Sequence, residues 1–416
     1  MGRPFLSSIP HTSRSFHHIR YRVVVLLLVF ALFQQQHLFH VHRQSLAAKY
    51  SSTDFTSSNQ ELQARFTRPD DEDSHFQEEL LANQESWNLL GAGWEGKVFV
   101  YKDSVIKTFT PGRSPFRNCA PSVASEKWPT EIPASLRFGG FWNHLEMNGF
   151  GRTRNESATL DGFLAVQTYF KASVVPSQPK EWFLVTPYLD GGNLNKLSRE
   201  LSTSTSTRNY QELDSRYRPA FNRLLKDMKS LHQAGYCHDD IKPANIFIRD
   251  SSHWVLGDLG NLRETSHPYH SSRLWRDNQQ LEDCRANDAV RALKSYLQFI
   301  QSSASDADEF RIAFFEGAEP ISRLFWWTLA GARSMSAAAL YERSLIEYPE
   351  AARSLDMDLE IPSPDSHRSL IGVFSRRMAL KGAVDDALQT RVGEKIARWW
   401  AMTWIFGLPV SDVCGV

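Results

Sequence analysis

One stretch of the chain constrains its fold more than any other. Residues 238–245 read His-Asp-Asp-Ile-Lys-Pro-Ala-Asn, and residues 257–260 read Gly-Asp-Leu-Gly. The first segment places an acid, an ammonium and an amide on one short loop, and the second adds an acid in a turn flanked by glycine. Phosphoryl transfer needs this set of groups, because the protein must position phosphates, hold Mg²⁺ on their oxygens and orient the attacking hydroxyl. The two segments therefore predict a phosphotransferase site.

Each polar side chain of these segments has an expected role. Asp240 would accept the proton of the attacking hydroxyl, and Lys242 would neutralise charge on the transferred phosphate. Asn245 and Asp258 would bind Mg²⁺ through oxygen, the ligand atom that this cation prefers. The pattern resembles the eukaryotic protein kinases, whose catalytic loop reads His-Arg-Asp-x-Lys-Pro-x-x-Asn in its commonest form and whose metal-binding turn reads Asp-Phe-Gly. The resemblance implies an ATP-dependent enzyme with an α+β, bilobal fold, in which a small β-rich N-lobe sits on a helical C-lobe.

Two residues depart from the family pattern. Asp239 stands where the family has an arginine that often receives the phosphate of a phosphorylated activation loop, so we expect no switching by that route. Leu259 replaces the phenylalanine of the metal-binding turn and leaves the ligand Asp258 unchanged. The resemblance also implies structural residues that brace the catalytic loop and the metal-binding turn: His238, Gly260 and Asp288.

A glycine-rich segment lies upstream, where residues 87–109 read as strands joined by glycine or polar turns. The Gly-x-Gly-x-x-Gly spacing lets backbone N–H groups approach phosphate where a side chain would collide. Val98 follows two residues after the last glycine, and Val-Ile-Lys107 follows on the next strand, as in the kinase family. A strand and not a helix follows the glycines, which excludes a dinucleotide-binding fingerprint. The residues expected around the nucleotide here are Gly91, Gly93, Gly96, Val98 and Lys107.

Lys107 requires a carboxylate from the following helix to hold it in place. Glu131 lies in the first turn of a helix opened by Pro129, where proline is tolerated and acid is favoured. Glu126 is nearer to Lys107 in the sequence but in a less clearly helical setting, and Pro133 makes the helix irregular. We expect Glu131 to be the partner.

The adenine side of the site is expected where the two lobes join. Strands are expected over residues 163–169 and 181–188, and the end of the second resembles the kinase hinge. Thr186 would guard the back of the adenine pocket. Pro187 has no N–H to donate, but the pocket needs only its carbonyl and the Leu189 N–H.

Helices are expected around the catalytic loop. Apolar residues recur at helical spacing over 221–231, with Gly235 as the stop. Residues 261–287 correspond to the activation segment of the kinase family but lack an Ala-Pro-Glu, and a further helix is expected to open at Asn287 and Asp288.

Composition excludes several classes of protein. The 416 residues are 42% hydrophobic and 23% charged, which is enough apolar content for a large core and argues against wholesale disorder. Lys+Arg and Asp+Glu both total 47, so there is no general attraction for nucleic acid, and none is expected as a partner. The cysteines lie far apart without a Cys-x-x-Cys pair, which argues against a zinc site and a disulfide scaffold. Reduced thiols are expected at all of them: Cys119, Cys237, Cys284 and Cys414.

The N-terminal part, up to Thr53, contains no Asp or Glu and holds the apolar run Val23–Phe33. Its 11 residues fall short of the ~20 that span hydrocarbon and fit the apolar core of a signal peptide. Three interpretations stay open: a signal or signal-anchor segment, an organelle transit peptide, and an untargeted tail. Because an exposed run of this kind promotes aggregation in a soluble tail, we favour membrane association through residues 20–41. Without it, the chain would be cytoplasmic or organellar.

These features divide the chain into three expected parts. Residues 1–43 form a basic and hydrophobic N-terminal segment. Residues 44–85, rich in Ser, Thr, Gln and acid and without a sustained period, are expected to be a disordered linker. Residues 86–416 form the kinase-like domain, with an N-lobe over about 86–189 and a C-lobe over about 190–416.

The leading hypothesis is a serine/threonine protein kinase that transfers the γ-phosphate of ATP to an unidentified protein substrate. Lys242 favours this over a small-molecule kinase of the same fold, since aminoglycoside-type kinases usually lack a lysine two residues after the catalytic acid. A pseudokinase scaffold that binds nucleotide without turnover is the non-enzyme alternative. The missing arginine and Ala-Pro-Glu point that way, but no catalytic ligand is missing from the sequence.

Overall fold

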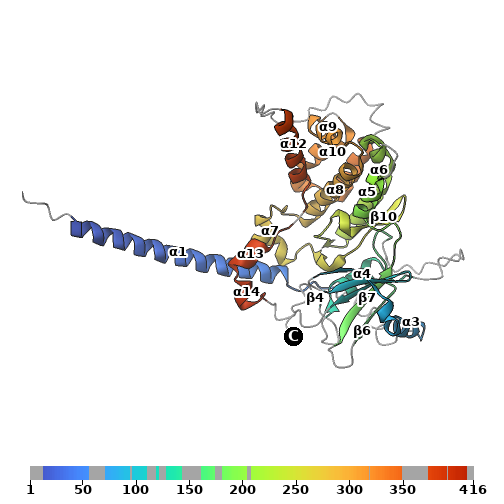
Figure 1. Cartoon of the computed structure of the whole chain (residues 1–416), viewed down its shortest axis with the longest axis horizontal. Helices are drawn as coiled ribbons and strands as arrows, with labels where there is room; N and C mark the ends of the chain where they lie inside the picture. The colour runs from blue at the N-terminus through green and yellow to red at the C-terminus, as the bar shows by residue number, and fades with distance from the viewer. Residues whose placement is uncertain are drawn as a thin grey trace, which may run out of the picture.

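Two lobes and one long N-terminal helix make up the described part of the chain (Figure 1). The arrangement is the α+β, bilobal one expected from the sequence. The computed structural model describes residues 13–55, 71–93, 96–109, 119–120, 128–142, 161–173, 180–203, 208–317, 319–348, 373–390 and 392–409.

The N-lobe is built on a five-stranded antiparallel sheet in the order β1-β2-β3-β7-β6. Its strands are β1 (Asn88–Ala92), β2 (Lys97–Tyr101), β3 (Ser104–Phe109), β6 (Thr168–Ala172) and β7 (Glu181–Pro187). The strand expected over 163–169 is displaced toward the C-terminus. Phe163 and Val166 instead form single bridges with Leu256 and Phe141, so no continuous ladder can start there.

One helix and two short strands complete the active-site side of the N-lobe. Helix α4 (Glu131–Phe138) begins two residues after Pro129, and almost all of its side chains are buried in the main hydrophobic core. Strands β4 (Cys119–Ala120) and β5 (Trp128–Pro129) pair just before it. This burial is what fixes the orientation of Glu131, because a helix packed on every side cannot rotate.

The C-lobe packs its helices around α6 and α8, whose buried apolar residues recur every three or four positions. Its helices are α5 (Leu194–Thr203), α6 (Tyr210–Gln233), α7 (Arg273–Asp277), α8 (Cys284–Ser303), α9 (Ala307–Glu316), α10 (Pro320–Ala330), α11 (Ala337–Ile346), α12 (Val373–Leu388), α13 (Lys395–Trp400) and α14 (Thr403–Phe406). Helix α8 begins earlier than the Asn287-Asp288 start expected from the sequence. The reason is that Asp283 caps it, accepting the Arg285 N–H at 2.9 Å.

Short strands and turns carry the catalytic loop between the lobes. The strands are β8 (Tyr236–Cys237), β9 (Ile246–Asp250), β10 (His253–Leu256) and β11 (Arg263–Glu264). Single 3₁₀ turns lie between them, η3 (Pro243–Asn245) and η4 (Leu259–Asn261), and a third, η5 (Pro268–Ser271), follows β11. Antiparallel pairing of β9 with β10 and of β8 with β11 holds both ends of the loop.

Helix α1 (Ser13–Lys49) projects far out of the domain (Figure 1). Its part from Ile19 to Lys49 is long and apolar enough to cross a membrane, a test that a signal sequence near an N-terminus also passes. The apolar run Val23–Phe33 is exposed along its whole length. The last turns instead pack beside α13 and α7.

Much of the linker expected to be disordered over 44–85 is folded. Leu46, Tyr50 and Phe55 are buried against the domain, and α3 (Asp71–Ala82) packs near β6. Residues 56–70 lie outside the described part of the chain. The polar composition gave no sign of this order, because it depends on a few large apolar side chains that pack against residues far away in the sequence.

Candidate active site

Lys107 on β3 contacts the carboxylate expected from α4 and, in addition, the carboxylate of the metal-binding turn. Its Nζ pairs with Glu131 from the first turn of α4 and, at 3.0 Å, with Asp258 Oδ1. The Lys107 ammonium holds the pKa of Asp258 at about 2, so this carboxylate is ionised at neutral pH. The other candidate partner, Glu126, lies outside the described residues.

Asp240 is the centre of a second group of polar side chains. Lys242 Nζ donates to Asp240 Oδ2 at 2.7 Å. Two side-chain amides donate to the same oxygen, Asn245 Nδ2 at 3.3 Å and Asn261 Nδ2 at 3.4 Å. The Asp240 side chain is 27% exposed, so a substrate hydroxyl has access to it. Asn261 was not predicted from the sequence. Its only signal there is that it closely follows Asp258, and the structure places it in the 3₁₀ turn η4.

The two expected metal ligands lie on segments that are hydrogen-bonded to each other. The Gly257 N–H donates to the Asn245 carbonyl at 3.0 Å, so the metal-binding turn starts directly beside the catalytic loop. Asn245 directs its amide nitrogen to the Asp240 carbonyl at 3.0 Å, which makes Oδ1 its ligand atom. Asp258 adds an ionised carboxylate that is 36% exposed. An amide oxygen beside an ionised carboxylate is a donor set that fits Mg²⁺.

The expected structural residues lie directly behind these groups. His238 is fully buried, with Nε2 3.1 Å from the Gly257 carbonyl oxygen. The Asp288 carboxylate accepts the backbone N–H of His238 at 2.6 Å and of Asp239 at 3.0 Å. Gly260 lies beside Glu131, but a Cβ built there would make only ordinary contact with that side chain.

The three glycines of the first hairpin differ in how much space their surroundings leave for a side chain. Gly93 N–H donates to the Gly96 carbonyl at 2.8 Å across the turn, whose residues 94 and 95 are not described. A Cβ on Gly96 would lie 1.6 Å from the Thr108 carbonyl oxygen, so the neighbouring strand β3 alone demands glycine there. At Gly91 no atom lies within 4 Å of such a Cβ. Packing against β3 is therefore sufficient to require glycine at position 96. A role of the three glycines in the approach of phosphate stays a prediction.

The remaining nucleotide-site residues follow the strands that meet at Lys107. Val98 on β2 lies opposite Lys107 in the antiparallel ladder. Thr186 is buried on β7 opposite Val105, and β7 ends at Pro187. Leu189 follows in the connection to the C-lobe, where its carbonyl accepts the Gly192 N–H at 2.8 Å. Thr186 and Pro187 thus lie at the end of a central strand, directly before the connection to the C-lobe.

Comparison with known proteins finds that part of the chain is similar to protein kinases. A family model described as a protein kinase domain matches residues 165–280, from β6 to the activation segment. Serine/threonine-protein kinase D of Synechocystis sp. is 36% identical over 190 residues, which cover 45% of this chain and 32% of that protein. A probable serine/threonine-protein kinase of Dictyostelium discoideum is 30% identical over 96 residues, covering 23% of this chain and 6% of that protein. The chain thus matches only a minor part of each relative's length. It contains a protein kinase domain.

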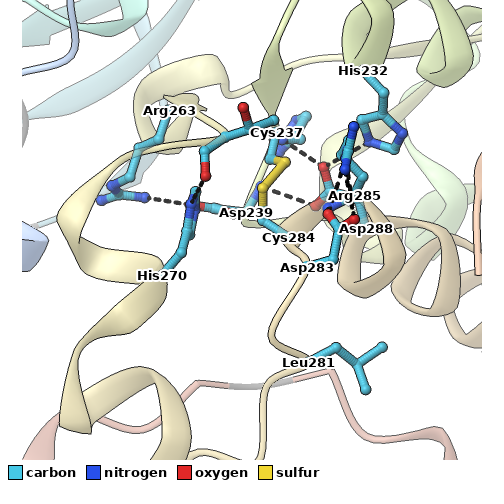
Figure 2. The surroundings of a disulfide bond; sticks show 12 residues. His232, Cys237, Asp239, Arg263, His270, Leu281, Asp283, Cys284, Arg285 and Asp288 are labelled. Atoms are coloured by element: carbon cyan, nitrogen blue, oxygen red, sulfur yellow. Dashed lines mark hydrogen bonds and ion pairs between the residues drawn. A yellow bond between two sulfur atoms is a disulfide. The ribbon is translucent and has the colours of Figure 1, made fainter. Parts of the chain in front are cut away.

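The kinase domain holds a buried charged cluster behind its catalytic loop (Figure 2). Asp239 Oδ2 pairs with Arg263 Nη1 at 3.1 Å and lies 2.9 Å from His270 Nε2. Burial opposes the charge on Asp239, but His270 and Arg263 together lower its pKa, so the carboxylate stays ionised. The position that carries an arginine in the family pattern therefore carries the opposite charge here. Both its partners come from the activation segment.

A disulfide between Cys237 and Cys284 lies next to this cluster (Figure 2). The expectation of reduced thiols is wrong for this pair. Strand β8 ends at Cys237 and α8 begins at Cys284. Backbone hydrogen bonds to the Asp288 carboxylate hold these ends together, and the Cα–Cα distance of the two cysteines is 6.0 Å. A sequence separation of 47 residues gave no spacing signal for the bond. The side chain of Cys119 and all of Cys414 lie outside the described part.

Proposed function

We propose that this kinase domain transfers the γ-phosphoryl group of ATP to a serine or threonine hydroxyl of a protein. The observation that carries the proposal is Lys107, held between Glu131 and Asp258 on the N-lobe side of the site. On the C-lobe side, Asp240 is held by Lys242 and two amides. The two halves supply the positioning and the proton acceptor that phosphoryl transfer requires.

Each residue then has a defined task. Lys107 contacts the α- and β-phosphates and is kept in place by Glu131. Asn245 and Asp258 would hold Mg²⁺, which neutralises charge on the phosphate oxygens. Asp240 orients the attacking hydroxyl and accepts its proton. Lys242 lies 2.7 Å from that carboxylate, close enough to neutralise charge on the transferred phosphate as the hydroxyl attacks.

The described geometry favours this over the two alternatives. A small-molecule kinase would need a closed pocket over Asp240, whereas Asp240 and Lys242 are partly exposed. A pseudokinase would be expected to lack a ligand or to misplace one. The relatives named above are serine/threonine protein kinases, which supports the hydroxyl class of the acceptor.

A direct test uses the purified full chain with Mg²⁺, radiolabelled ATP and a generic basic protein. We expect phosphate on serine and threonine of the acceptor or of the chain itself, and we expect Asp240→Asn to abolish it. The matched control is Asp277→Asn, which makes the same change at an exposed acid of α7. A wild-type chain that binds ATP but transfers no phosphate would favour the scaffold, and labelling of small molecules alone would favour the other kinase class.

A second proposal concerns α1. We propose that α1 associates with a membrane through residues 20–41. Next to its base, α13 and α14 expose Trp399, Trp404 and Phe406, and the Phe406 ring lies 5.6 Å from that of Phe39. Aromatic side chains of this kind are enriched where a membrane helix meets the headgroups. Their exposure beside the apolar helix supports an interface at this level.

Fractionation of cells that express the full chain tests α1. We expect the protein in the membrane fraction after carbonate extraction, with its N-terminal peptide intact by mass spectrometry. Leu27→Arg on the exposed face should release it, whereas Leu345→Arg, at an exposed leucine of α11, should not. A mature protein that begins near residue 44 would identify a cleaved signal or transit peptide instead.

A further inference from the structure

Residues 46–55, called the clamp segment below, connect the exposed part of α1 to the activation segment. Hydrogen bonds reach three successive parts of residues 262–267. They run from Thr53 Oγ1 to the Leu262 carbonyl at 3.1 Å, from the Asp54 N–H to the Glu264 carboxylate, and between Ser51 Oγ and His267 Nε2 at 3.0 Å. The contacts lie on both sides of β11, so the clamp segment follows the activation segment over its first part.

Buried aromatic rings reinforce these hydrogen bonds. Phe55 is 0% exposed and stacks on Tyr236 of β8, with ring centroids 5.5 Å apart. The Tyr236 hydroxyl in turn donates to the Asp54 carbonyl at 2.8 Å. Tyr50 is buried in the same cluster as Tyr269 and Trp275 of the activation segment. The clamp segment is therefore part of the folded core and not a passing linker.

One guanidinium links the clamp segment to the catalytic loop. Arg263 Nη2 donates to the Lys49 carbonyl at 3.2 Å, while Nη1 pairs with Asp239. Its side chain is buried, so both interactions are shielded from solvent. Asp239 directly precedes Asp240, the proposed base. Arg263 therefore connects the clamp segment to the residue that directly precedes the proposed base.

The far side of the clamp segment is fixed to α13. Lys49 Nζ forms an ion pair with Glu394, and the Tyr50 hydroxyl donates to the same carboxylate at 2.8 Å. Burial opposes the charge on Glu394, but Lys49 and the Tyr50 hydroxyl lower its pKa to about 2, so this carboxylate is ionised at neutral pH. The clamp segment is thus anchored on both sides, to the start of α13 and to the activation segment.

We propose that the clamp segment takes the role that a phosphate on the activation segment has in kinases that are activated by phosphorylation. It holds the activation segment and, through Arg263, sets the position of Asp239 and Asp240. The negative charge of Asp239 fits this role. A phosphate on the activation segment would bring negative charge toward this buried carboxylate instead of toward an arginine. The inference rests on the kinase activity proposed above. Thr53, Phe55 and Arg263 are positioning residues, since they act on the base through Asp239.

The test uses the full chain after phosphatase treatment and measures kcat, KM for ATP and hydrogen exchange of residues 261–275. Thr53→Val removes one hydrogen bond at nearly constant volume, and Phe55→Ala removes the stacked ring. We expect both to lower kcat, Phe55→Ala by about ten- to hundredfold, as a misplaced catalytic group does. KM for ATP should stay unchanged, and residues 262–270 should exchange faster. The matched control is Thr328→Val on α10, a buried hydroxyl that also donates to a backbone carbonyl.

Three outcomes decide between the claims. Unchanged kcat and exchange in Thr53→Val and Phe55→Ala would overturn the inference, and Thr53→Val keeps the test decisive if Phe55→Ala does not fold. Loss of wild-type activity on phosphatase treatment, with recovery after phosphorylation of the activation segment, would overturn it as well. If the wild-type chain transfers no phosphate, the proposed function fails, but faster exchange confined to residues 262–270 would still support the clamp.

Discussion

The catalytic loop has two faces, and its adjacent aspartates point to different ones. Asp240 lies on the solvent-accessible face, called the cleft face below, where it is partly exposed and held by Lys242 and by side-chain amides. Asp239 faces the rear, where it is almost fully buried between Arg263 and His270. The chain reverses between them, with Asp239 at φ 62° in the left-handed region. The cleft face carries groups for chemistry, and the rear face carries the contacts that hold those groups in order.

The two faces also differ in electrostatic environment. Asp240 and Lys242 are partly exposed, so water screens their charges and removing one leaves little unpaired charge behind. Charges on the rear face are buried and depend on their partners, so removing one strands the others. Substitutions in the cleft should therefore change activity at nearly constant stability, and substitutions behind the loop should change stability first.

The largest expected effect separates the faces most clearly. Asp240→Asn should lower the rate of phosphoryl transfer by about 10²- to 10⁴-fold, because the hydroxyl loses its proton acceptor. Its thermal unfolding should stay close to that of the wild type, since the side chain is open to solvent. Steady-state kinetics and calorimetry on the same preparation measure both. A large drop in unfolding temperature would show that the cleft face is structural too.

The next effect concerns the rear face. Asp239→Ala leaves Arg263 and His270 buried without their carboxylate and should cost about 3–5 kcal/mol in the free energy of unfolding. Urea denaturation checks this, with Asp277→Ala at an exposed position of α7 as the control. The combined variant Asp239→Ala with Arg263→Met should recover part of the loss, because it removes the stranded charge. Additive losses would instead mean that the two side chains do not depend on each other.

The two faces differ in how far sequence predicts them. The residues of the cleft face can be predicted from short motifs, since the chemistry fixes their spacing on consecutive loops. They are Asp240, Lys242, Asn245 and Asp258. The rear face is assembled by tertiary contact at any separation. Arg263 bonds Asp239 from 24 residues away and Lys49 from 214. Patterns of polarity could not show this, because Tyr50 and Phe55 look like isolated apolar residues in a polar stretch until the groove that buries them exists.

A smaller effect tests the disulfide on the rear face. Cys284→Ser should lower stability by about 2–4 kcal/mol, because it frees a loop of the unfolded chain that the Cys237–Cys284 bond closes. A reducing agent should lower the wild type to the same level and leave the variant unchanged. Unfolding curves with and without reductant measure this. Equal wild-type stability in both conditions would show that the rear face is held by its hydrogen bonds and ion pairs alone.

The smallest effect comes from the titration of His270. Burial disfavours its charge, but the Asp239 carboxylate prevails and raises the pKa of His270 above the ordinary value of 6.5. A raised pKa means that folding favours the proton, so this contribution is complete below pH 6.5 and is lost as pH rises through the folded pKa. The other groups around it are Arg263, which opposes the charge, the Thr265 carbonyl, and His267, which burial keeps neutral with a pKa of about 3.

His267 acts in the opposite direction but only below pH 6.5, where the unfolded chain takes up a proton that the folded chain refuses. The measurement therefore begins at pH 6.5 and proceeds upward. Over that range the free energy of unfolding should fall in the wild type, and His270→Gln should lose this slope while keeping a donor for Asp239. The fall should be modest, because Arg263 stays charged and still pairs with the carboxylate. An equal slope in both proteins would place the proton elsewhere and would leave Arg263 as the group that keeps Asp239 ionised.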